Sequence, residues 1–103
     1  MIKVSVFYPN SDGCNFDIEY YCLHHMPLVQ RLCGAALQGV AVERGIGGEM
    51  AGVPPAFIAL GHLLFDSVDA FQSSFGPHVE EIKGDITNYT NIKPIIQISE
   101  VKL

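Results

Sequence analysis

The sequence has few charged residues and no long apolar run. Charged side chains make up 17% of its 103 residues, against about 25% in a typical soluble domain, and the mean hydropathy is +0.26. Disorder is excluded, because it needs low hydrophobicity and high net charge. A membrane-spanning helix needs about 20 consecutive apolar residues, whereas the best run, Ala56 to Phe65, is short and contains His62. We therefore expect one soluble domain over residues 1–103 and no contact with a membrane.

Basic residues are also scarce. Six Lys and Arg stand against 11 Asp and Glu, which gives a formal charge of −5, and the basic residues are scattered along the chain. An acidic chain without a basic stripe repels phosphate backbones, so we expect no nucleic-acid partner. No charged start is followed by an apolar stretch and a small-residue cleavage site. The sequence therefore predicts a cytoplasmic protein.

Cysteine is present, but its spacing fits neither a disulfide framework nor a zinc site. The three cysteines, Cys14, Cys22 and Cys33, form an odd set without a C-x-x-C pair. This pattern argues against a disulfide framework and against a zinc site built on thiolates. We expect the cysteines to be small, partly buried hydrophobic residues, and we predict no metal site and no cofactor.

Periodicity predicts four strands and two helical regions. Residues 2–8 alternate in strand fashion, with Val4 and Val6 on one side and Ser5 on the other. Further strands are expected at 37–46, 56–65 and 94–101. A helix is expected at 17–31, capped by Asp17 or Asn15 and ended by Gly34, and a second helical region begins at Ser67 and is broken at Gly76-Pro77.

The order strand, helix, strand, strand, helix, strand is typical of a ferredoxin-like α+β fold, βαββαβ, with a four-stranded antiparallel sheet. One layer of helices covers only one face of such a sheet. The strand at 56–65, however, is apolar on both faces. We therefore expect the open face to pack on the same face of a second copy, which makes a homodimer.

His25 is the main candidate for chemistry. It lies on the apolar stripe of the first helix, at spacings of three and four with Ile18, Tyr21, Leu28 and Leu32. Pro27 should distort the helix beside it, because proline lacks an amide donor. A histidine pointing between helix and sheet could move a proton near neutral pH or act as an axial ligand. The alternative is a core histidine that is satisfied by a carbonyl freed at the distortion.

Other polar residues have weaker patterns. His24 is expected in solvent, as is His78 beside Pro77. His62, in the middle of a strand, could line the same pocket or the subunit contact. Ser5 and Gln97 lie among apolar neighbours on their strands, where they could orient a bound polar group or form hydrogen bonds within a dimer interface.

The first helix also carries a recognisable motif. Tyr20-Tyr21-x-x-x-His25-Met26-Pro27-Leu28 resembles the Y-[YW]-x-x-x-H-x-P-L signature of the EthD family, named for ethyl tert-butyl ether degradation, within the dimeric α/β-barrel proteins. Further segments are similar to that family over essentially the whole chain. These segments are Val42–Gly45, Gly61–Ser67, Phe75–His78, Asn88–Thr90 and Pro94–Ser99.

The resemblance implies a fold and several possible functions. It implies a dimeric α/β barrel whose ligand lies between helices and sheet, and the signature histidine corresponds to His25. It implies a catabolic role in degrading ethers or other apolar xenobiotics. Together with the positions of the side chains in the predicted elements, we expect His25 and Tyr21 as catalytic residues and Ser5, His62 and Gln97 as ligand-binding residues for a small apolar molecule. The alternatives are a carrier or accessory protein for a P450-type oxidase system, or, more weakly, a haem-binding protein.

Overall fold

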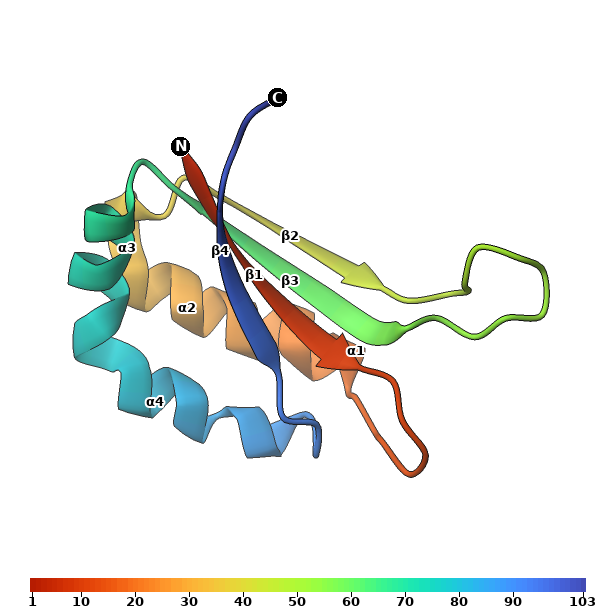
Figure 1. Ribbon diagram of the computed structural model, residues 1–103. Helices are drawn as coiled ribbons and strands as arrows, with labels where there is room; N and C mark the ends of the chain where they lie inside the picture. The colour runs from red at the N-terminus through yellow and green to blue at the C-terminus, as the bar shows by residue number, and fades with distance from the viewer.

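The computed structural model describes residues 1–103 and contains the expected four-stranded antiparallel sheet. Its strands are β1 (Ile2–Pro9), β2 (Gly39–Arg44), β3 (Phe57–Phe65) and β4 (Ile95–Glu100). They lie side by side in the order β2-β3-β1-β4, and each neighbouring pair is antiparallel. Every helix lies on one side of this sheet (Figure 1). The predicted ferredoxin-like βαββαβ architecture is therefore confirmed.

The two helical regions are each made of several short segments. The first consists of α1 (Ile18–Tyr20), a π-helical turn (Tyr21–His25) and α2 (Met26–Cys33), followed by a 3-10 turn (Gly34–Ala36). The second consists of α3 (Val68–Phe75), a 3-10 turn (Gly76–His78), α4 (Val79–Gly84) and a last 3-10 turn (Ile86–Asn88). None of these helices is both long and apolar enough to cross a membrane.

The predicted helix ends are confirmed by their capping contacts. The Asp17 carboxylate accepts a hydrogen bond from the Tyr20 amide at 3.0 Å, and the Ser67 hydroxyl accepts one from the Ala70 amide, also at 3.0 Å. Each contact satisfies an amide that has no partner within the helix. At the other end, Gly34 has a φ of +62°, a conformation that glycine adopts without strain.

The buried face of the first helical region differs from the predicted stripe. Tyr21 and His25 are buried as expected, but beyond them the buried residues are Met26, Val29 and Cys33. Leu28 and Leu32, expected on the stripe, are only half-buried. The reason is the π-helical turn, in which the Met26 amide donates to the Tyr21 carbonyl, five residues back. The wider turn contains one extra residue and so advances the buried face by one position.

The strand register separates the sheet into a covered face and an open face. Val4, Tyr8, Ala59, Leu63 and Phe65 point toward the helices and are buried. On the other face, Ser5 lies between His62 of β3 and Gln97 of β4. The half-buried side chains of Ile58, Leu60 and Leu64 share this open face with the exposed Ile95. The same face also carries Lys3, Glu43 and Ser99, so it mixes apolar and polar side chains, and no helix covers it (Figure 1).

Candidate functional site

A cavity of about 260 Å³ lies between the helices and the covered face of the sheet. Eleven of its 16 lining residues are hydrophobic, among them Val6, Val29 and Leu63. His25 and Tyr21, the two residues predicted to be catalytic, both line it. Ligand pockets usually measure about 300–1,000 Å³, so this one suits a small organic molecule and is small for a tetrapyrrole.

His25 is held by a carboxylate on the opposite helical region. Its Nδ1 lies 2.9 Å from Oδ2 of Asp85, the residue that follows α4. Both side chains are largely buried, with 6% and 13% of their surfaces exposed. A carboxylate accepts hydrogen bonds, so the imidazole proton resides on Nδ1 and is donated to Asp85. This leaves the Nε2 lone pair on the cavity side of the ring.

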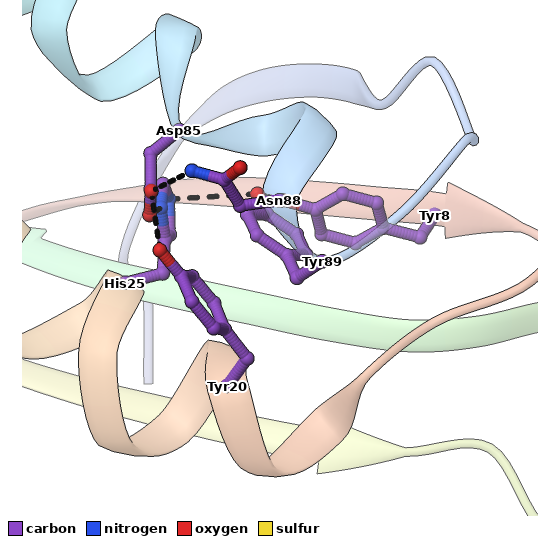
Figure 2. A network of polar contacts seen from close by, with 6 residues as sticks. All are labelled: Tyr8, Tyr20, His25, Asp85, Asn88 and Tyr89. Atoms are coloured by element: carbon purple, nitrogen blue, oxygen red, sulfur yellow. Dashed lines mark hydrogen bonds and ion pairs between the residues drawn. The ribbon is translucent and has the colours of Figure 1, made fainter.

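Asp85 receives two further hydrogen bonds. The Tyr20 hydroxyl donates to its Oδ1 at 2.7 Å, and the Asn88 amide donates to the same oxygen at 2.9 Å. Figure 2 shows these donors converging on the carboxylate together with His25. Burial by itself raises the pKa of Asp85, but the hydrogen bonds from Asn88, Tyr20 and His25 outweigh it and lower that pKa below its usual value. Asp85 is therefore ionised at neutral pH.

His25 itself is neutral at neutral pH. Burial disfavours the imidazolium and lowers the pKa of His25 below its ordinary value of 6.5, although the contact with Asp85 opposes the shift. Its Nε2 lies 3.5 Å from the Tyr89 hydroxyl, which is at the limit of hydrogen-bond distance. A neutral imidazole with its proton fixed on Nδ1 and a weakly engaged Nε2 has the form of a general base.

A cluster of aromatic rings surrounds the imidazole. Tyr21 stacks on it with ring centroids 5.4 Å apart and an interplanar angle of 14°, and the Tyr89 ring contacts it at 4.7 Å. The hydroxyls of Tyr8 and Tyr89 lie 2.7 Å apart, so a chain of polar groups runs from Tyr8 through Tyr89 to His25. Burial raises the pKa of each of these three tyrosines, which are therefore neutral donors at physiological pH.

Gly61 on β3 makes room for this cluster. A Cβ atom at Gly61 would lie 2.1 Å from the Tyr21 hydroxyl oxygen, a distance that atoms in van der Waals contact do not reach. The absence of a side chain therefore allows the Tyr21 ring to lie over β3 and under His25.

The chain is similar to several solved structures, one of them a close relative. An EthD-like protein from Ralstonia eutropha JMP134 is 46% identical and superposes with a TM-score of 0.95, over 99% of this chain and 92% of that one. The chain belongs to the EthD family. More distant proteins share its fold. No family model matches the chain, and no curated protein matches it.

Two of those distant proteins show how widely the fold occurs. An ethyl tert-butyl ether degradation (EthD) family protein from Bacillus halodurans C-125 is 19% identical, with a TM-score of 0.75 over 99% of both chains. A dimeric protein of unknown function and ferredoxin-like fold from Bacteroides fragilis NCTC 9343 is 11% identical, with a TM-score of 0.54 over 97% of this chain and 95% of that one. At these identities the likeness concerns the fold alone.

Three predicted ligand-binding residues of this EthD chain do not lie at the cavity. Ser5, His62 and Gln97 sit on the open face of the sheet, because alternate residues of a strand point to opposite faces. Their expected place at the cavity is therefore wrong, and the alternative, a role in a dimer interface, stays a prediction. The Ser5 hydroxyl instead lies 2.9 Å from His62 Nδ1, and His62 Nε2 lies 2.9 Å from Glu43.

Three residues of the EthD site were not expected from the sequence. Asp85, Tyr89 and Gly61 were not predicted as functional, although Gly61 and Tyr89 fall within segments that resemble the family. Asp85 carries no local signal, since it is separated from His25 by 60 positions. Only the antiparallel packing of the two helical regions brings them together. His24 is exposed, as expected, whereas His78 is half-buried.

Proposed function

We propose that this EthD protein is an acid/base catalyst in the degradation of ethers or other apolar compounds. Its substrate would be a small apolar molecule bound in the cavity, and His25 would move a proton. The observation that carries the proposal is the His25–Asp85 contact at 2.9 Å, which leaves a neutral imidazole nitrogen as an acceptor at a mainly hydrophobic cavity. A titratable group in a cavity, with a lowered pKa and a specific charge partner, is a candidate for proton transfer.

The roles of the surrounding residues follow from their contacts. Nε2 of His25 takes an acidic proton, an O–H or a C–H beside a carbonyl, from the bound molecule, which keeps the electron pair, and the ionised Asp85 stabilises the imidazolium that forms. The Tyr89 hydroxyl, 3.5 Å from Nε2 and paired with Tyr8, is placed to donate to negative charge that develops on the substrate. Tyr21 acts by stacking, which fixes the plane of the imidazole.

The proposed assembly is a homodimer joined through the open sheet faces. The chain exposes 6421 Å², against about 5,700 Å² for a compact folded chain of this mass. It is only 19 Å thick along its shortest axis, which corresponds to one sheet and one layer of helices. A second sheet packed on the open face would cover Leu60, Ile95 and the Ser5–His62 pair.

The decisive experiment is loss of the base. We expect His25→Ala to reduce turnover of an ether or a related apolar compound by roughly 10²–10⁴-fold, the usual contribution of a positioned general base. The adjacent and exposed His24 provides the control, because His24→Ala removes an imidazole without touching the cavity. Activity that survives in a folded His25→Ala protein would refute the catalytic role.

A non-catalytic carrier is the second candidate. It is favoured by the mainly hydrophobic lining and by neutral tyrosines that already satisfy one another with hydrogen bonds. Incubation of the pure protein with candidate compounds separates the two functions. A carrier releases its ligand chemically unchanged, whereas the proposed enzyme converts it.

A further inference from the structure

The charges that line the cavity are unlike those of the rest of the chain. The protein as a whole carries −5, with 11 acidic residues. Yet no aspartate or glutamate lines the cavity, whereas Lys83 and Lys93 both do. Two of the six basic residues of an acidic protein are thus gathered at one opening.

The two lysines mark the mouth of the cavity. Lys83 lies on α4, and Lys93 lies in the segment that precedes β4, so they approach the cavity from two different elements. Both are exposed, unlike the buried Val29 and Leu63 of the interior. Neither lysine has a carboxylate within 4.0 Å, because the three ion pairs of the chain join His25 to Asp85, His62 to Glu43 and Lys102 to Glu100. Their ammonium groups are therefore free to meet a negative charge brought by a ligand.

We propose that the cavity takes an amphipathic organic anion: a small apolar body with one carboxylate. The apolar body lies against the hydrophobic interior near His25, and the carboxylate stays at the mouth beside Lys83 and Lys93. This arrangement leaves the charged group partly hydrated and avoids the large cost of burying it. The inference rests on the proposed function only in that the cavity binds a ligand, and it requires no reaction there.

The test compares two ligands of the same shape and different charge. At pH 7.5 we would measure the binding of 4-ethylbenzoate and of the neutral 4-ethylbenzamide by isothermal titration calorimetry. We expect the benzoate to bind about five- to tenfold more tightly, which is what two exposed ion pairs supply. This preference should shrink as salt is added, because exposed charges are screened.

Variants assign the preference to the two lysines. The double variant Lys83→Gln/Lys93→Gln should bind both probes equally, whereas Lys83→Arg/Lys93→Arg should keep the preference for the benzoate. Lys102→Gln is the matched control, since Lys102 is exposed and pairs with Glu100 away from the cavity. Because all three positions are exposed, we expect the variants to fold.

The possible failures are distinguishable. If the wild-type protein binds both probes equally, or if the Lys83→Gln/Lys93→Gln protein keeps its preference, the anionic ligand is refuted while the apolar ligand of the proposed function stands. If neither probe binds at millimolar concentration, the inference fails and the proposed function also loses the support of a ligand site. Loss of turnover in His25→Ala with an unchanged preference for the benzoate is the expected result when both proposals hold.

Discussion

Which nitrogen of His25 carries its proton is decided by a residue 60 positions away. Asp85 accepts hydrogen bonds from Tyr20 and Asn88 as well as from His25 Nδ1, and these donors keep it ionised. The carboxylate in turn selects the Nδ1–H tautomer and leaves Nε2 as an acceptor toward the cavity. The state of the candidate base is therefore set by neighbouring groups and not by the histidine itself.

Replacing Asp85 should change that tautomer. In Asp85→Asn, the amide can donate as well as accept, so we expect a mixture of tautomers where the wild-type protein has Nδ1–H. The ¹⁵N chemical shifts of the His25 ring measure this directly and need no substrate. Asp69→Asn, on the exposed first turn of α3, is the control. A wild-type His25 protonated on Nε2 would contradict the proposed role.

At the scale of the elements, the π-helical turn positions the site. It places Tyr21 and His25 on the buried face and then shifts the face so that Met26 and Val29 continue it. Helical turns of this kind are rare and occur often at functional sites. Here the turn ends at His25, two residues before Pro27, which has no amide to donate to the preceding turn.

The sequence predicted the elements better than it predicted their contacts. Alternation and capping residues located all four strands and both helix starts, because those signals lie within a few residues of each other. The distortion beside Pro27 was predicted, but its form as a π turn was not. Because the π turn shifts the buried face, the burial of Met26 instead of Leu28 was also not predicted. The His25–Asp85 contact depends on packing between distant helices, and no local pattern encodes it.

The packing of the π turn on β3 can be tested at Gly61. In Gly61→Ala, the new methyl group would meet the Tyr21 hydroxyl oxygen at 2.1 Å, so the ring must move. We expect the free energy of unfolding to fall by about 1–3 kcal/mol, as overpacking of a core usually costs. Urea denaturation measures it. Gly84→Ala is the matched control, because a Cβ there meets nothing within 4 Å, and its stability should change little. Equal stabilities of the two variants would contradict this packing.

At the scale of the whole molecule, the buried histidine makes folding sensitive to acid. Burial lowers the pKa of His25 below 6.5, so just under pH 6.5 the unfolded chain binds a proton at this residue that the folded chain does not. Stability contributed by His25 is therefore lost as the pH falls below 6.5. The lowered pKa of Asp85 adds a further loss below about pH 3.8, where the unfolded carboxyl group takes up its proton.

This acid sensitivity should weaken when His25 is removed. We expect the free energy of unfolding of the wild-type protein, measured in urea at one fixed protein concentration, to decrease between pH 6.5 and pH 4.5. His25→Gln should show a shallower decrease over the same range, whereas His24→Gln, exposed and outside the cavity, should follow the wild type. Parallel curves for the wild-type and His25→Gln proteins would show that His25 does not couple folding to pH.

The open sheet face predicts how the protein assembles. The apolar side chains of this face, Leu60 and Ile95 among them, are covered by no helix, which is unfavourable in water, and packing two copies face to face removes both sets from solvent at once. A charge in the middle of that contact would be buried without a partner and repeated by the two-fold symmetry. We therefore expect the wild-type protein to sediment as a dimer and Leu60→Asp as a monomer. Leu23→Asp, on the outer surface of the first helical region where Leu23 is 67% exposed, should remain dimeric. A wild-type protein that sediments as a monomer at every concentration, or a Leu60→Asp protein that stays dimeric, would refute assembly through this face.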